Sequence, residues 1–380
     1  MRNQILIISF LMTLFSACNQ KPDKSLGSYN NHDLKLTSDR MTPEALWSFG
    51  QLGNLEVSPN GKTIAYTVSY SNIEENRSYS DIYIVPTKGG SPIQITHTNN
   101  NESQVGWRPD GKKITFLSKE TGETQLWEMN VDGSQRKQIS NIEEGITGYI
   151  YSPDMKHIAF TKTVKLDATP NDIHPDLPKA NARIETDLMY RHWDSWSDYT
   201  YNHIFIATYS TDGTFNEGFD ILEGERFNSP TKPFGGIDEL AWTPDGQQLA
   251  YTCKKLNGKE AAFSTNSDIY LYHLDNKTTT NLTKGMMGYD VNHVFSSDGK
   301  RMAFESMERD GYEADKVRLM VLEMSSGKIT DLTRNFDHNV RNIVWDKNGD
   351  YIWFSSSVEG TEQIYLLNLV TGSIDKTTSG

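Results

Sequence analysis

The sequence predicts an all-β protein built from repeated small sheets, and three observations carry this prediction. A four-residue turn with Asp or Asn at its third position recurs six times, beginning at Ser58, Arg108, Ser152, Thr243, Ser296 and Asp346. A large apolar residue precedes each turn, and a short apolar strand segment follows it. The turns begin 50, 44, 91, 53 and 50 residues apart. A period of about 45–50 residues with short strands is typical of the blades of a β-propeller.

Each repeat also contains signals for its remaining strands. A second-strand segment such as Ile64–Tyr66 follows the turn, a third-strand segment such as Ile82–Tyr83 comes next, and the repeat closes near a Thr or Ser. The third repeat shows no clear closing residue. We therefore expect six four-stranded blades, at 53–97, 104–141, 147–236, 238–284, 290–334 and 340–380, within a propeller that spans residues 41–380.

Three of the apolar residues that precede the turns are Trp107, Trp242 and Trp345. They follow the repeat in register, so we interpret them as packing between blades and not as a sugar-binding platform. The repeat thus assigns these indoles to the core.

Composition and motifs exclude several kinds of chemistry. The chain has 380 residues, with 37 basic and 50 acidic side chains and a net charge of −13, which disfavours a nucleic-acid partner. No serine lies in a G-x-S-x-G elbow, so the triad of a serine hydrolase is not expected in these residues. The nine histidines and two cysteines show no metal-ligand spacing. We expect no catalytic residue, metal or cofactor.

The first residues have the pattern of an export signal. Residues 5–15 are almost wholly apolar, which is too short to span a membrane as a helix, and Ser16 and Ala17 precede Cys18. We expect a signal peptide at 1–17, lipidation of Cys18 in the manner of a bacterial lipoprotein, and a tether at 18–40. A plain cleaved signal is the alternative. Either form places the protein in the cell envelope, as a periplasmic protein or an outer-membrane lipoprotein.

The third repeat carries an insertion, which we place at 164–202. Its first part, Asp167–Lys179, is rich in proline and predicts an irregular excursion. Its second part gathers aromatic and charged residues, and loops of such length in compact domains are commonly functional. The candidate substrate-binding residues are Tyr190, Arg191, Trp193 and Asp194. For Arg191 and Asp194, a structural ion pair that pins the insertion is an equal alternative.

Three segments give the chain a family resemblance. They are the opening Met41-Thr42-Pro43-Glu44-Ala45-Leu46-Trp47, the first turn Ser58-Pro59-Asn60-Gly61, and the run Asp187-Leu188-Met189-Tyr190-Arg191-His192-Trp193-Asp194. With them the chain resembles the N-terminal propeller half of the prolyl oligopeptidase family of serine peptidases. The likeness is to the acylaminoacyl-peptidase and dipeptidyl-peptidase 5 branch of Bacteroidetes-type bacteria. The turn is generic to propellers, whereas the opening and the insertion are more specific.

The resemblance implies a function and a partner. In that family an α/β-hydrolase domain with a Ser-Asp-His triad follows the propeller, which admits and orients short peptides. We therefore expect the non-catalytic part of a dipeptidyl- or acylaminoacyl-peptidase, inactive alone, from a truncated seven- or eight-bladed propeller. Its partners would be a short peptide and the missing hydrolase domain. The alternative is a stand-alone TolB-like propeller that serves as a protein-binding scaffold in the periplasm.

Overall fold

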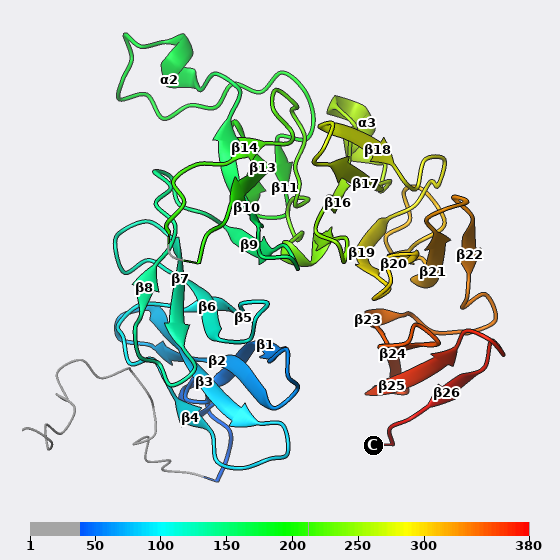
Figure 1. Cartoon of the computed structure of the whole chain (residues 1–380). Helices are drawn as coiled ribbons and strands as arrows, with labels where there is room; N and C mark the ends of the chain where they lie inside the picture. Colours follow the sequence, from blue (N-terminus) through cyan, green and yellow to red (C-terminus); the bar gives the residue numbers. More distant parts are fainter. Residues whose placement is uncertain (1–38, 212, 380) are drawn as a thin grey trace, which may run out of the picture. The chain divides into compact units, whose positions relative to one another are not determined.

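The computed structural model describes residues 39–211 and 213–379. The expected signal peptide, the lipidation of Cys18 and nearly all of the tether lie outside the described residues. Within them the fold is all-β, with six four-stranded sheets, a two-stranded hairpin and a few short helices. Figure 1 colours the sheets in chain order, from blue to red. The predicted fold class, a propeller of six visible blades, is confirmed.

Strands follow one another in chain order within every sheet, except where the hairpin interrupts the third. The first sheet contains β1 (Gln51–Val57), β2 (Thr63–Asn72), β3 (Arg77–Pro86) and β4 (Ile93–Gln94). The second contains β5 (Ser103–Trp107), β6 (Lys113–Ser118), β7 (Gln125–Asn130) and β8 (Lys137–Gln138). The third contains β9 (Gly148–Tyr151), β10 (His157–Lys165), β13 (Thr200–Thr208) and β14 (Phe219–Asp220).

The later sheets repeat the same arrangement. The fourth contains β15 (Leu240–Trp242), β16 (Gln248–Cys253), β17 (Asp268–His273) and β18 (Thr278–Asn281). The fifth contains β19 (Asp290–Phe295), β20 (Arg301–Ser306), β21 (Arg318–Glu323) and β22 (Ile329–Asp331). The sixth contains β23 (Arg341–Trp345), β24 (Tyr351–Val358), β25 (Thr361–Asn368) and β26 (Ile374–Lys376).

The remaining elements are short. They are α1 (Pro43–Trp47), α2 (Pro170–Ile173), the hairpin strands β11 (Arg191–His192) and β12 (Ser195–Trp196), the 3-10 helix η2 (Ile237–Glu239) and α3 (Gly258–Phe263). The Thr42 side chain caps α1, with Pro43 at its first position. None of the helices in the described ranges is long and apolar enough to cross a membrane.

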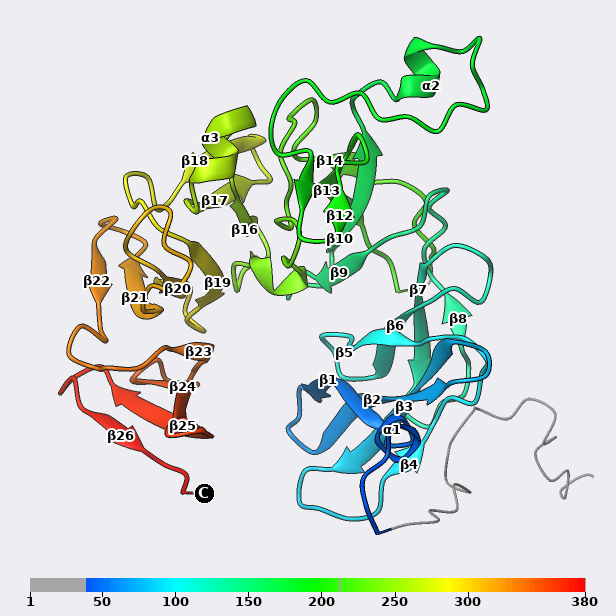
Figure 2. The same ribbon diagram turned by 180° about the vertical axis from the view of Figure 1, so that it is seen from behind.

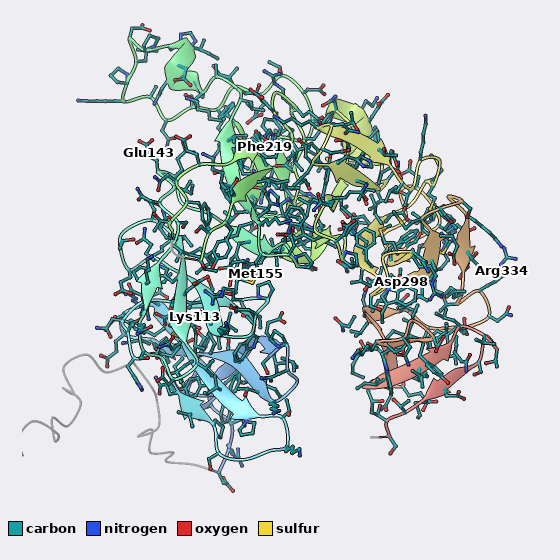
Figure 3. The ribbon with its side chains drawn as sticks, viewed as in Figure 1. Lys113, Glu143, Met155, Phe219, Asp298 and Arg334 are labelled. Atoms are coloured by element: carbon teal, nitrogen blue, oxygen red, sulfur yellow. The ribbon has the colours of Figure 1, made fainter. Side chains whose placement is uncertain are left out.

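The recurring turns share one hydrogen-bonding pattern. In each, the fourth residue donates a backbone hydrogen bond to the first, as Gly299 does to the Ser296 carbonyl at 2.8 Å. The Asp298 carboxylate, labelled in Figure 3, accepts from the Ser296 hydroxyl at 2.7 Å and the Lys300 amide at 3.1 Å. The third turn places Met155 in the left-handed region, at a φ of 58°, where four of the other turns have glycine at a φ of 68–70°.

The Thr or Ser that closes a repeat latches its fourth strand to its third. Its hydroxyl accepts from the amide of a buried third-strand residue: Thr283 from Ile269 at 3.0 Å, and Thr333 from Leu319 at 2.8 Å. Thr96 and Ser140 make the same bond to buried residues in the first and second repeats, and Thr378 makes it to the exposed Ile364 in the sixth. In the third repeat β14 pairs with β13 as in the other sheets, but Leu222 stands where the others have the Thr or Ser.

The described chain forms two compact units. One contains residues up to Glu120 together with Glu128–Arg136, and the other contains Thr121–Trp127 with the chain from Lys137 onward. Within the second unit, the fourth, fifth and sixth sheets follow one another side by side in both views (Figures 1 and 2).

Neighbouring sheets of the second unit bury alternate faces against each other. Ala250, Ile269 and Leu271 of the fourth sheet share one apolar cluster with Met302, Phe304, Met320 and Leu322 of the fifth. The indoles add directional contacts: Trp345 donates to the Val294 carbonyl at 3.0 Å, and Trp242 to the Ile150 carbonyl at 3.4 Å. In the first unit Trp107 donates to Glu56 in the same way. The interpretation of these tryptophans as packing between blades is confirmed.

Candidate functional site

The second unit contains a pocket of about 660 Å³. Three segments that connect second to third strands contribute to it: the insertion between β10 and β13, the connection between β16 and β17, and the connection between β20 and β21. The segment Thr231–Phe234 and Tyr289 complete the wall. The pocket therefore forms where connections from three successive sheets meet.

The insertion is held to the third sheet at its base. Asp167 accepts hydrogen bonds of 2.7 Å from the Arg226 guanidinium and from the Tyr201 hydroxyl. Partial burial opposes ionisation of Asp167, but these hydrogen bonds outweigh it and hold the pKa of the carboxyl below its usual value. Burial, together with the Asp167 carboxylate, raises the pKa of Tyr201 to about 12. Both groups therefore keep the charge states that suit this contact near neutral pH.

The excursion expected at Asp167–Lys179 contains one turn of helix, α2, which projects from the third sheet (Figures 1 and 2). Thr169 and Asp172 form a capping box, which satisfies the first amides of the turn. Lys165 and Thr169 hold the pKa of Asp172 at about 2. Within the predicted irregular excursion, the Thr-Pro start and the acidic third position stabilise this one helical turn.

The hairpin β11–β12 carries the four predicted substrate-binding residues. Arg191 lies opposite Trp196, with its guanidinium 5.6 Å from the indole, and donates to the Trp193 carbonyl at 2.9 Å. Tyr190 stacks on the same indole at 6.1 Å. Asp194 is exposed and accepts from the Ser195 hydroxyl at 3.3 Å. The ion pairs of the described residues do not include Arg191 with Asp194, so the structural alternative for this pair was wrong.

Trp193 is the one predicted residue that lines the pocket. It lies at the hairpin tip and is 70% exposed, whereas the core indole of Trp242 is 8% exposed. Its ring packs edge-on against Phe234 with 6.0 Å between ring centres. Tyr190, Arg191 and Asp194 lie beside the pocket and not in its wall. Their predicted role in binding substrate stays a prediction.

The opposite wall was not predicted from the sequence. Lys254 donates to the carbonyls of Ala261 and Ser264 and so holds α3, which presents Phe263 to the pocket. Burial lowers the pKa of Lys254. The Asp310 carboxylate accepts from the Ser264 hydroxyl at 2.6 Å, which ties the connection of the fifth sheet to that of the fourth.

A buried carboxylate supports the segment Thr231–Phe234. Glu239 accepts from the Thr231 amide at 2.7 Å and from its hydroxyl at 2.6 Å. Burial raises the pKa of Glu239 to about 7, against the effect of these hydrogen bonds. A side chain at Gly235 would lie 2.5 Å from the Thr231 backbone, so this turn requires glycine. The Thr231–Phe234 wall is therefore fixed from behind.

The wall of the pocket is mainly apolar. It includes Met189, Phe234, Phe263, Met307 and Tyr312, and its charged members are Lys232, Lys254 and Glu313. Among the described residues, no group of His, Cys, Asp and Glu is arranged to hold a metal ion. The thiol of Cys253 is fully buried, and burial raises its pKa to about 12, which leaves it unreactive.

Comparison with known proteins shows the class of fold. A model of the family described as the TolB beta propeller domain matches residues 49–216. The Pyrococcus horikoshii acylaminoacyl peptidase superposes with a TM-score of 0.61 and 16% identity, over 88% of this chain and 47% of that one. The β-propeller domain of the Trilobed protease from Pyrococcus furiosus superposes with a TM-score of 0.55 and 15% identity, over 87% of this chain and 84% of that one. The chain is thus a β-propeller of the kind found in these proteins.

Its relatives in sequence are more specific. The chain is 45% identical to the dipeptidyl-peptidase 5 of Porphyromonas gingivalis over 344 residues, which are 90% of this chain and 50% of that protein. The protein of the same name from Porphyromonas endodontalis is 42% identical over 343 residues, which are 90% of this chain and 49% of that protein. The chain therefore spans about half the length of these relatives, and the resemblance that the sequence indicated is confirmed.

Proposed function

We propose that this chain is the non-catalytic propeller portion of a peptidase that acts on short peptides. The observation that carries the proposal is the 45% identity to a dipeptidyl-peptidase 5 along 90% of the chain but only 50% of the relative. The part of the relatives that this chain does not span would contain the hydrolase domain. In this arrangement the propeller gates and orients the peptide, and the hydrolase domain cleaves it.

The pocket supports a binding role. Among the aromatic side chains that line it, Trp193, Phe234, Phe263 and Tyr312 are more than half exposed. Exposed aromatic groups around a concavity bind apolar side chains, because contact removes both surfaces from water. Tyr190, Arg191 and Asp194 beside the pocket would supply the polar contacts of a peptide terminus, as the resemblance implies.

The experiment compares the 380-residue chain with the native gene product purified from its own cells. We expect the native product to hydrolyse dipeptidyl anilides and the 380-residue chain to show no turnover. In the native product, Trp193→Ala should raise KM about tenfold with little change in kcat, which corresponds to about 1.4 kcal/mol of lost contact. Phe49→Ala, an exposed aromatic in the first unit, is the matched control. Turnover by the purified 380-residue chain would overturn the proposal.

We also propose that the protein is exported and anchored through Cys18. The apolar run at 5–15 and the small residues before Cys18 support this. Metabolic labelling with a fatty-acid analogue should mark the wild-type protein and not the Cys18→Ser variant. Equal labelling of both would exclude the anchor.

The stand-alone scaffold remains a second candidate, because the TolB propeller family matches residues 49–216. It predicts a native product of 43.1 kDa that binds envelope proteins and hydrolyses no peptide. The same comparison of native and 380-residue proteins separates the two candidates.

A further inference from the structure

One carboxylate joins two of the connections that form the pocket. Asp310, between β20 and β21, accepts a hydrogen bond of 2.6 Å from the Ser264 hydroxyl and one of 2.9 Å from the Thr265 amide. Both donors lie in the connection between β16 and β17. The Gly311 amide returns a hydrogen bond of 2.9 Å to the Thr265 hydroxyl. These three hydrogen bonds, which we call the Asp310 tie, link the fourth sheet to the fifth.

The acceptor of the tie is a charged group. The hydrogen bond from Ser264 is the main cause that holds the pKa of the Asp310 carboxyl below its usual value, and it outweighs the effect of burial. Asp310 is therefore ionised near neutral pH, and hydrogen bonds to an ionised acceptor are stronger than those between neutral groups. A residue without this carboxylate would release both donors of the fourth-sheet connection.

On the side of the fourth sheet, the tie holds the end of a short helix. α3 has six residues, and an isolated helix of this length is not stable in water. Its C-cap residue is Ser264, and the Lys254 ammonium donates to the carbonyls of Ala261 and Ser264. Phe263, which lines the pocket, directly precedes Ser264. Asp310 thus helps to fix the backbone that carries this ring.

On the side of the fifth sheet, the tie acts on a loop that is closed by its own ion pair. The Arg309 guanidinium donates to the Asp315 carboxylate at 2.9 Å through Nε and at 2.5 Å through Nη2. The same guanidinium lies 4.1 Å from the centre of the Tyr312 ring, which lines the pocket. Because Asp310 belongs to this closed loop, its bond to Ser264 sets where Tyr312 lies relative to α3.

We propose that Asp310 is a positioning residue of the pocket, which fixes the spacing of Phe263 and Tyr312 so that a peptide side chain meets both rings already in place. The inference rests on the proposed function, which makes the pocket a peptide-binding site. Asp310 lies outside the wall itself, next to Gly311, and acts through these two rings. Such preorganisation raises affinity, because the two connections are ordered on folding and not on binding.

The exposure of the two rings explains why they need this support. Phe263 is 69% exposed and Tyr312 is 54% exposed, so packing in the core cannot hold either ring. Another part of the wall is supported in the same way, since Glu239 also accepts from one hydroxyl and one amide, both of Thr231. Glu239 is buried, whereas Asp310 is exposed and can be replaced without opening the core.

Kinetics of the native gene product test the effect on binding. Asp310→Ala should raise KM for a dipeptidyl anilide about fivefold and change kcat by less than about twofold, because the loss falls on binding. Asp310→Asn keeps one acceptor oxygen and should give a KM between those of the wild type and Asp310→Ala. An unchanged KM in Asp310→Ala would overturn the inference.

A matched control lies in the same sheet. Asp298, in the turn between β19 and β20, likewise accepts from a Ser hydroxyl and a backbone amide, at 2.7 and 3.1 Å. Asp298→Ala should leave KM as in the wild type. An equal rise of KM in Asp298→Ala and Asp310→Ala would show a general loss of structure and contradict a positioning role.

Hydrogen exchange of the 380-residue chain tests the tie without relying on activity. In Asp310→Ala, residues 258–267 should exchange at least about fivefold faster, whereas β16 in the core of the fourth sheet should exchange as in the wild type. Unchanged exchange at 258–267 would overturn the inference. An active native product with unchanged KM refutes this inference alone. An inactive native product refutes the proposed function alone, because hydrogen exchange still decides whether Asp310 fixes the wall.

Discussion

The sheets and the connections around the pocket differ in how the sequence specifies them. In the sheets one position recurs with one environment: Phe304 and Phe354 both pack against an alanine of the preceding sheet and are fully buried. Around the pocket no position recurs, since Trp193, Phe263 and Tyr312 come from connections of unlike sequence and are exposed. The comparison indicates that the repeated positions of the sheets stabilise the fold. The connections contribute little to stability, so their residues can vary to suit a ligand.

The largest effect on stability should come from a substitution in the core between the sheets. Phe304→Ala removes a fully buried ring between the fourth and fifth sheets and should lower the free energy of unfolding by about 3–5 kcal/mol. Chemical denaturation followed by circular dichroism measures it. A loss below about 1 kcal/mol would contradict the assignment of this position to the core.

The buried carboxylates should make stability depend on pH. Burial raises the pKa of Glu239 and of Asp290 to about 7 in the folded protein, above the ordinary values of 4.5 and 3.8. A raised folded pKa stabilises the fold fully below the unfolded pKa, and this contribution is lost as pH rises through about 7. For Glu239 the change amounts to about 3 kcal/mol.

Thermal melts between pH 4.5 and 8 measure this dependence in the wild type and in Glu239→Gln. Stability should fall with rising pH in the wild type, and the fall should be smaller in the variant, whose amide does not ionise. The same slope in both proteins would show that Glu239 titrates normally.

A smaller loss of stability should follow from removing the hydrogen bond between one closing Thr and the third strand of its sheet. Thr283→Val keeps the shape of the side chain but leaves the buried Ile269 amide without its 3.0 Å acceptor, which should cost about 1–3 kcal/mol. Thr280→Val, on the exposed fourth strand of the same sheet, is the control and should change the free energy of unfolding by less than about 0.5 kcal/mol. Equal losses in the two variants would exclude a specific latch.

The smallest effect on stability should come from the pocket wall. Phe263→Ala removes a 69% exposed ring from the end of α3 and should change the free energy of unfolding by less than about 0.5 kcal/mol. The same variant should weaken peptide binding by the native product. If instead it destabilises as strongly as Phe304→Ala, the contrast between sheets and connections fails.

The sequence predicted the features that recur from blade to blade, but few of the features that occur once. The turns recur six times, the closing Thr or Ser five times and the tryptophans between sheets three times, and at each of these positions local preferences and packing agree. The closing strand β14 escaped prediction because its Phe219–Asp220 pair lacks the latch. Lys254, Phe263 and Tyr312 escaped it because the pocket joins connections distant in sequence, each of which lacks a motif of its own.

The central claim is that this chain is one portion of a longer peptidase, and the mass of the native gene product tests it most directly. An immunoblot of the cells that produce the protein, with antibody raised against residues 41–380, reports that mass. The account predicts a band tens of kDa above 43.1 kDa, about twice that mass, in line with relatives of which this chain covers 50%. A band at 43.1 kDa would contradict the account and leave the propeller as a protein that acts alone.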